Sequence, residues 1–185
     1  PWRYTRPGRA PGCMRVHTAP GWLVLVRVGA AVGAEAVADR PGCRALATAG
    51  HATAAAHGDP DGERIPLDLM IDAIGRIVAA VDLPVSADLE SGYGDVADTV
   101  RRAIGVGAVG AHLADGMRPL GESGAAVRAA VTAGEAAGIA FGPHARTAPS
   151  LPAGHRHPQR ALHASVRPAS PPPRPLASCP SRPRR

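Results

Sequence analysis

Short apolar runs alternate along the chain with segments in which apolar residues recur at helical spacing. Five runs are typical of strands, at residues 23–28, 45–49, 84–89, 108–113 and 138–141. Between the second and third runs, apolar residues recur every three or four positions from 67 to 81, which predicts an amphipathic helix. Two more helices are predicted at 96–105 and 123–137. Strands that alternate with helices form parallel βαβ units, so the pattern predicts an α/β fold.

The helix predicted at 96–105 carries a start signal of its own. Asp95 precedes its apolar stripe and Asp98 follows three residues later, which resembles an acidic variant of a capping box. This signal predicts a helix that begins directly after Asp95.

Two acidic residues stand at the end of the third predicted strand. The segment PVSADLESGYG places Asp88 and Glu90 two positions apart, after apolar strand residues and before a glycine-rich turn. Successive side chains of a strand alternate between its faces, so Asp88 and Glu90 point the same way. The turn at 92–94 lacks the lysine and Ser/Thr of a P-loop, and we interpret it as the turn that orients the two carboxylates.

Charge is distributed unevenly along the 185 residues. All fifteen acidic residues lie between Glu35 and Glu135, together with eight arginines, which gives this part a net charge of −7. The remaining thirteen arginines lie in the flanks, which contain no acid, and the chain contains no lysine. The acidic middle argues against nucleic-acid binding by the folded part, despite an overall charge of +6.

The flanks are rich in Pro, Arg, Gly and Ala and poor in large apolar residues. This composition does not build a core, so residues 1–20 and 151–185 are expected to be disordered, on either side of a domain at 21–150. One alternative role for the basic tail is binding to nucleic acid or an acidic surface. Because the tail lacks aromatic residues, such binding would be nonspecific and salt-dependent. A shifted reading frame of a GC-rich gene is another explanation of the composition.

Cysteine usage and hydropathy predict a protein of the reducing cytoplasm. Cys13, Cys43 and Cys179 are scattered, without the spacing of a disulfide framework or a zinc site. The longest apolar run, at 22–26, is too short to span a bilayer. We therefore expect a water-soluble protein with no membrane partner.

Five segments of the middle part carry a family resemblance: ALATAG, GDPDGE, PVSADLESGYG, GAVGAHLADG and HART. Together they resemble the isocitrate lyase/phosphoenolpyruvate mutase superfamily of magnesium-dependent (β/α)-barrel enzymes. The resemblance covers about residues 23–150 and is strongest over 45–116. It implies a TIM barrel. Because a complete (β/α)8 barrel typically needs about 250 residues, we expect a partial barrel of about five βα units.

The resemblance also implies a site. The family holds Mg²⁺ through carboxylates at successive strand ends, and the matching residues are Asp61, Asp88 and Glu90. Carboxylate oxygens are the hard ligands that this ion prefers. Arg146 matches the arginine that pairs with the substrate carboxylate in the family, so it is the candidate catalytic and substrate-binding residue.

Several positions depart from the family pattern. Ala49 and Gly50 stand where the family carries substrate-binding serines, so their backbone N–H groups are the candidate donors to a substrate anion. Ala114 replaces the glutamate that completes the metal shell. Neighbouring Asp115 points to the opposite face of the strand, so it could substitute only if the strand end bulges or a water fills the gap. We therefore expect weaker metal binding than in intact relatives. Ala148 replaces the aspartate that follows HART.

The loop after the fourth strand narrows the activity that the resemblance implies. Family members that cleave 2-hydroxy-tricarboxylic acids carry a cysteine there as proton donor, and residues 116–123 contain none. We therefore expect a magnesium-dependent lyase or phosphomutase that acts on a small 2-oxo acid, phosphoenolpyruvate or phosphonopyruvate through an enolpyruvate-like intermediate. The alternative is a catalytically inactive remnant of the family. Homo-oligomers are typical of the family.

Overall fold

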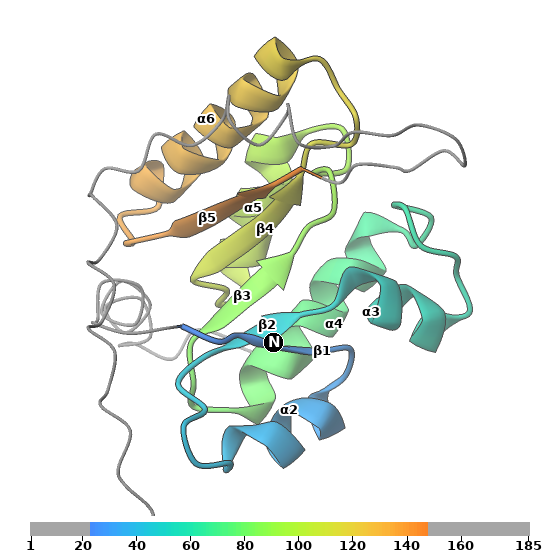
Figure 1. Ribbon diagram of the computed structural model, residues 1–185, viewed down its shortest axis with the longest axis vertical. Coiled ribbons are helices and arrows are strands. Elements are labelled where there is room, and N and C mark those ends of the chain that lie inside the picture. The colour runs from blue at the N-terminus through green and yellow to red at the C-terminus, as the bar shows by residue number, and fades with distance from the viewer. Residues whose placement is uncertain (1–22, 148–185) are drawn as a thin grey trace, which may run out of the picture. The chain divides into compact units, whose positions relative to one another are not determined.

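The computed structural model describes residues 23–147, so the expectations for 1–20 and 151–185 lie outside the described residues. Within them, five strands form one sheet in the order β1-β2-β3-β4-β5, and every neighbouring pair is parallel (Figure 1). The strands are Val26–Val28, Leu46–Thr48, Val85–Asp88, Gly110–Ala114 and Gly142–Arg146. The predicted α/β fold is confirmed.

Five helices accompany the strands within residues 23–147: α2 (Ala31–Ala38), α3 (Gly50–His57), α4 (Leu67–Ala80), α5 (Val96–Gly105) and α6 (Leu120–Ala136). α2 contacts α4, α4 contacts α5 and α5 contacts α6, so this helical layer follows the order of the strands (Figure 1). Right-handed crossovers between sequential strands place these helices on one face of the sheet, which is the arrangement of a (β/α) barrel. The predicted partial barrel is confirmed. In the described part of the chain, no helix has the length and apolar character needed to cross a membrane.

The hydrophobic pattern of α4 determines how this helix packs. Met70, Ile74 and Val78 are each at most 1% exposed, and α4 lies against β3. Full burial of such a side chain contributes roughly 1.5–3 kcal/mol. On the outer surface of the same helix, Asp72 forms an ion pair with Arg76 one turn later (2.6 Å). The helical spacing in the sequence therefore marks the face that packs on the sheet.

Of the two aspartates in the predicted capping signal, only Asp95 caps α5 with its side chain. The Asp95 side chain accepts a hydrogen bond from the backbone N–H of Asp98 (3.0 Å), which caps the first turn. The carboxylate of Asp98 forms an ion pair with Arg101 (3.2 Å). Asp95 is thus the N-cap, while Asp98 supports the outer face of the helix.

The fifth strand does not lie where the sequence predicted it. The residues at 138–141 form a turn after α6, in which Gly138 has a φ of +66°. Phe141 packs against the hydrophobic core beside Gly134 of α6, where an added Cβ would lie 2.5 Å from the Phe141 Cβ. The strand is Gly142–Arg146, which pairs with β4. The prediction of a strand at 138–141 was wrong because its apolar residues serve the packing of the turn on the helix.

One face of the sheet carries polar side chains. The register pairs Asp88 of β3 with His112 of β4, and His112 with His144 of β5, so these three residues share a face. Two residues along, Ala114 pairs with Arg146 on the same face. The sequence neighbours of Asp88 and His112 belong to the hydrophobic core. The polar face therefore reaches the carboxyl edge of the sheet at Asp88 and Arg146.

Candidate active site

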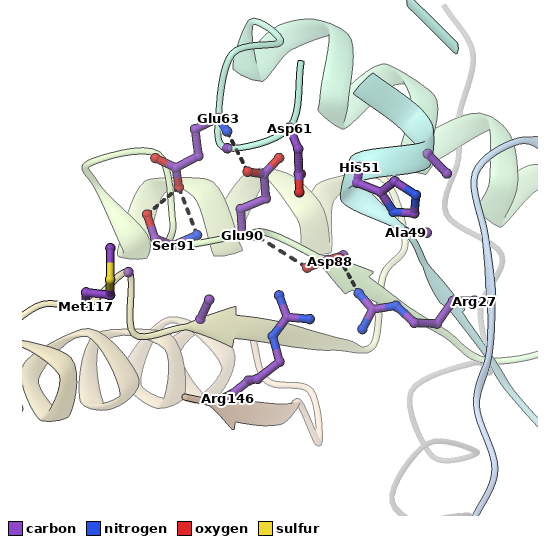
Figure 2. A pocket seen from close by; sticks show the side chains of 14 residues that line it. Arg27, Ala49, His51, Asp61, Glu63, Asp88, Glu90, Ser91, Met117 and Arg146 are labelled. Atoms are coloured by element: carbon purple, nitrogen blue, oxygen red, sulfur yellow. Dashed lines mark hydrogen bonds and ion pairs between the residues drawn. The ribbon is translucent and has the colours of Figure 1, made fainter. Parts of the chain in front are cut away.

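A pocket of about 760 Å³ lies at the carboxyl ends of the strands, the edge at which barrels of this kind carry their sites. Five of the six residues that the sequence singles out line it: Ala49, Asp61, Asp88, Glu90 and Arg146. The sixth, Gly50, contacts Asp88. Figure 2 shows the Arg146 guanidinium directed towards the side of the pocket that holds Asp88 and Glu90. The topology therefore gathers candidate residues from the junction of β2 with α3, from β3 and the turn after it, from β5 and from the loop before α4.

Asp88 is fixed by contacts from three neighbouring segments. It ends β3 and is 5% exposed. Its Oδ2 accepts a hydrogen bond from the backbone N–H of Gly50 (3.0 Å) and forms an ion pair with Arg27. The backbone N–H of Asp88 donates to Oγ1 of Thr48 (2.7 Å). Such partners are required because a buried carboxylate without them is strongly destabilising.

Glu90 lies two residues beyond Asp88 in a strained backbone conformation, with a φ of +49°. Its Oε2 accepts a hydrogen bond from the backbone N–H of Glu63 (2.5 Å), and the Tyr93 hydroxyl donates to its Oε1 (3.4 Å). Burial raises the pKa of Glu90, the hydrogen bond from Glu63 lowers it, and the charges of Asp61, Glu63 and Asp88 raise it again. The pocket thus concentrates negative charge, which favours a cation.

Glu63, which the sequence analysis did not single out, connects two loops of the pocket. Its Oε1 accepts hydrogen bonds from the backbone N–H (2.9 Å) and hydroxyl (2.7 Å) of Ser91 and from the backbone N–H of Tyr93 (2.8 Å). Its own backbone N–H donates to Glu90. Glu63 therefore holds the turn after β3 against the loop before α4. The sequence feature that could have identified Glu63 is its place in the motif GDPDGE, two residues after Asp61.

A family comparison identifies what this chain is related to. Residues 14–167 match the model of the family described as phosphoenolpyruvate phosphomutase. The chain belongs to the phosphoenolpyruvate mutase/isocitrate lyase superfamily. A comparison with curated proteins gave no match. The resemblance that the sequence motifs carry is therefore confirmed at the level of the superfamily.

Solved structures of the superfamily share the fold over most of this chain. A proposed phosphonomutase from Burkholderia cenocepacia J2315 is 42% identical over 74% of this chain, with a TM-score of 0.69. An oxaloacetate acetylhydrolase is 27% identical over 79% (TM-score 0.70), and a 2,3-dimethylmalate lyase is 26% identical over 76% (TM-score 0.67). The matches cover 60%, 55% and 53% of these proteins, respectively. The chain thus spans little more than half the length of these superfamily members.

Superfamily members are typically magnesium-dependent, and the donor chemistry of this pocket suits that ion. Asp61, Asp88 and Glu90 offer hard carboxylate oxygens. Gly50 leaves space beside two of them, because a Cβ there would lie 3.2 Å from Cγ of Glu90 and 3.4 Å from Oδ2 of Asp88. Within residues 23–147, no three His, Cys, Asp or Glu side chains are already arranged to hold a metal ion. The three carboxylates fit magnesium chemically, but their side chains would have to converge on it.

Ala114, where the sequence resemblance implies a glutamate, lines the pocket without offering a ligand. Asp115 lies in the turn that follows. Its backbone N–H donates to the carbonyl of Arg146 (2.9 Å), and its Oδ1 accepts a hydrogen bond from the backbone N–H of Met117 (3.2 Å). These contacts give Asp115 a role in the turn, and the expectation that it does not replace the glutamate stays a prediction.

The backbone donors of Ala49 and Gly50 already have partners. The N–H of Ala49 donates to the carbonyl of Val28 (2.9 Å), and that of Gly50 donates to Asp88. His51 and Ala52, in the first turn of α3, line the pocket. Substrate binding by Ala49 and Gly50 stays a prediction, and the donor of Gly50 would have to leave Asp88 to take part.

Two arginines line the pocket, and the sequence analysis singled out only one of them. Arg146, the residue that the sequence singled out, is exposed at the end of β5. Arg27 lies in the middle of β1 and reaches Asp88. The sequence feature that could have identified Arg27 is its charge, because the other residues of the run at 23–28 are apolar.

His112 and His144 stack on the polar face of the sheet, with ring centroids 4.7 Å apart. Burial lowers the pKa of His112 to about 4, and the positive charges of His144, Arg27 and Arg146 act in the same direction, while Asp88 opposes them. Nε2 of His112 is buried without a hydrogen-bond partner in the described part of the chain. The fold therefore favours the neutral form of this imidazole.

We expect the protein to lose stability through this histidine as the pH falls from about 6.5 to about 4. In that window the unfolded chain binds a proton at His112 that the folded chain does not, so the free energy of unfolding decreases with the pH. Replacing His112 by asparagine should flatten the pH profile of thermal unfolding midpoints. The raised pKa of Glu90 makes the protein more stable as the pH falls, but this contribution is the same in wild type and in His112→Asn.

His57→Asn is the matched control, because His57 is exposed on α3. Its profile should follow the wild type. Parallel profiles for wild type and His112→Asn would contradict the assignment of the buried neutral imidazole.

Proposed function

We propose that this protein is a magnesium-dependent lyase or phosphomutase that acts on a small 2-oxo acid, phosphoenolpyruvate or phosphonopyruvate. The observation that carries the proposal is the single pocket that Asp61, Asp88, Glu90 and Arg146 share at the carboxyl ends of the strands. The relatives support this substrate class, since one is an oxaloacetate acetylhydrolase that was solved with its product oxalate and another is a 2,3-dimethylmalate lyase. All of these names refer to small carboxylic acids.

Some residues of the pocket would bind a cation, and another would bind the substrate anion. Asp61, Asp88 and Glu90 would hold magnesium, whose charge would stabilise the developing negative charge of an enolpyruvate-like intermediate. Arg146 would bind a substrate carboxylate, since its planar guanidinium can donate two parallel hydrogen bonds to such a group. Glu63 would keep Glu90 in place through the contacts described above.

A catalytically inactive superfamily member is the second candidate. Ala114 supplies no ligand, and Arg27 already neutralises Asp88. Both features weaken a metal site without disturbing the fold. The third candidate, anion or nucleic-acid binding by the basic tail, concerns residues outside the described ones and stays a prediction.

Thermal unfolding with and without magnesium and oxalate tests the proposal. Oxalate resembles the enolate of pyruvate, and a ligand that binds only the folded state raises the unfolding midpoint. We expect magnesium and oxalate together to raise the midpoint by several degrees, which would justify assays of the mutase, hydrolase and decarboxylase reactions. An unchanged midpoint would favour the inactive candidate.

A pair of matched variants shows whether such a shift comes from the pocket. Asp61→Asn removes one candidate ligand from an exposed position, so it should reduce the shift with little effect on the midpoint of the ligand-free protein. Asp39→Asn makes the same change at the exposed end of α2, away from the pocket, and should keep the full shift. An equal shift in all three proteins would place the ligands elsewhere.

A further inference from the structure

Arg27 is a charged residue in a strand that otherwise carries valines. It lies in β1, and its register partner Ala47 is itself paired with Ser86, which places Arg27 on the same face of the sheet as Asp88. Figure 2 shows its guanidinium directed at the Asp88 carboxylate, with which it forms an ion pair. The side chain of Asp88 is 6% exposed and that of Arg27 is 35% exposed. The pair therefore joins a buried acid to a half-buried base.

We propose that Arg27 is a built-in counter-cation that competes with magnesium for Asp88 and so sets the metal affinity of the pocket. The proposal rests on the metal site of the proposed function but not on any particular reaction. It gives Arg27 a role that no superfamily motif in the sequence assigns.

The contacts of Asp88 explain why the two cations compete. Its Oδ2 already accepts hydrogen bonds from the Arg27 guanidinium and the N–H of Gly50. Among residues 23–147, its Oδ1 accepts only the backbone N–H of Glu90, at 3.4 Å. Direct coordination through Oδ2 requires Arg27 to leave. Arginine stays protonated at every physiological pH, so the competition does not disappear by titration.

Burial also explains why a cation is needed at this position in either state. A buried carboxylate that loses its partner is strongly destabilised, because neither water nor another charge compensates it. Arg27 supplies that compensation without metal, and magnesium would supply it when bound. Removing Arg27 should therefore harm the metal-free protein and strengthen its binding of metal.

Binding of magnesium alone, measured by calorimetry on wild type and Arg27 variants, tests the proposal. We expect Arg27→Gln to bind magnesium roughly tenfold more tightly, which is the effect of about 1.4 kcal/mol. Arg27→Lys keeps the charge and should stay close to wild type. Arg101→Gln removes the same charge from the exposed surface of α5 and should leave the affinity unchanged.

Thermal unfolding provides a second measurement that does not require a tight-binding variant. In the absence of metal, Arg27→Gln should unfold below wild type, and saturating magnesium should close the difference. If Arg27→Gln folds only when magnesium is present, that result also supports the proposal. If Arg27→Gln stays unfolded even in magnesium, the double variant Asp88→Asn/Arg27→Gln is the deciding test. This double variant lacks the buried charge of Asp88, so it should fold where Arg27→Gln alone does not. If the double variant is unfolded as well, the proposal is overturned.

The remaining outcomes separate this proposal from the proposed function. Equal magnesium affinity in wild type and Arg27→Gln, or tighter binding by Arg101→Gln as well, overturns the role of Arg27 and leaves the metal site standing. Binding by Arg27→Gln but not by wild type supports the role of Arg27 and favours the inactive candidate. Absence of binding in all variants overturns both the role of Arg27 and the metal site.

Discussion

Replacement of Glu63 by alanine is expected to lower the free energy of unfolding by about 3 kcal/mol. The change removes three accepted hydrogen bonds and leaves the backbone N–H groups of Ser91 and Tyr93 without their partner in a half-buried turn. Hydrogen bonds to a charged group are the stronger kind, so their loss exceeds that of a surface contact. Urea unfolding monitored by circular dichroism measures the difference.

Two further variants separate the side chain of Glu63 from its backbone. The residue has a φ of +60°, a conformation in which glycine is favoured over alanine by about 1 kcal/mol. Glu63→Gly should therefore be less destabilised than Glu63→Ala, although both lack the carboxylate. Glu35→Ala, at an exposed position of α2, should stay within about 0.5 kcal/mol of wild type. If Glu63→Ala is as stable as Glu35→Ala, the contacts of Glu63 do not stabilise the turn.

Gly110→Ala is expected to cost about 2–3 kcal/mol and to disturb the substrate side of the pocket. A Cβ at Gly110 would lie 2.7 Å from the carbonyl oxygen of Gly142 and 3.1 Å from Oγ of Ser86. The first of these atoms belongs to the backbone of β5, so the strand itself must move. Because β5 ends in Arg146, we expect weaker binding of oxalate as well as a lower urea midpoint.

Gly105→Ala is the matched control for this substitution. Gly105 is the last residue of α5, and nothing lies within 4 Å of an added Cβ. Alanine is favoured over glycine in a helix by up to about 1 kcal/mol, so this variant should be as stable as wild type or more so. Equal urea midpoints and oxalate affinities for Gly110→Ala and Gly105→Ala would show that β4 and β5 accommodate the methyl group.

The elements that the sequence predicted are those with a strong apolar pattern. α4 has a buried stripe at helical spacing, and β3 is an apolar run between a helix and a turn. α2 and α3 were not predicted, because both are eight residues long and rich in small residues that form no distinct apolar stripe. β5 contains Pro143 and His144, which do not resemble a buried strand, so the apolar residues before it were chosen instead.

The candidate site was predicted through motifs and not through its contacts. Motif matches named Asp61, Asp88, Glu90 and Arg146, and the structure places all four around one pocket. The ion pair of Arg27 with Asp88 joins residues 61 positions apart. Nothing in the local pattern of either strand specifies that pairing, because it depends on how the strands between them order and align.

Glu90 has a consequence for protein engineering because it holds its side chain on left-handed backbone. A screen for thermal stability would reward glycine or asparagine at this position, since both tolerate positive φ better than glutamate does. Such a gain would remove a carboxylate from the pocket. Stabilised variants from an unguided screen are therefore expected to lose metal binding, and libraries intended to preserve it should hold residue 90 constant.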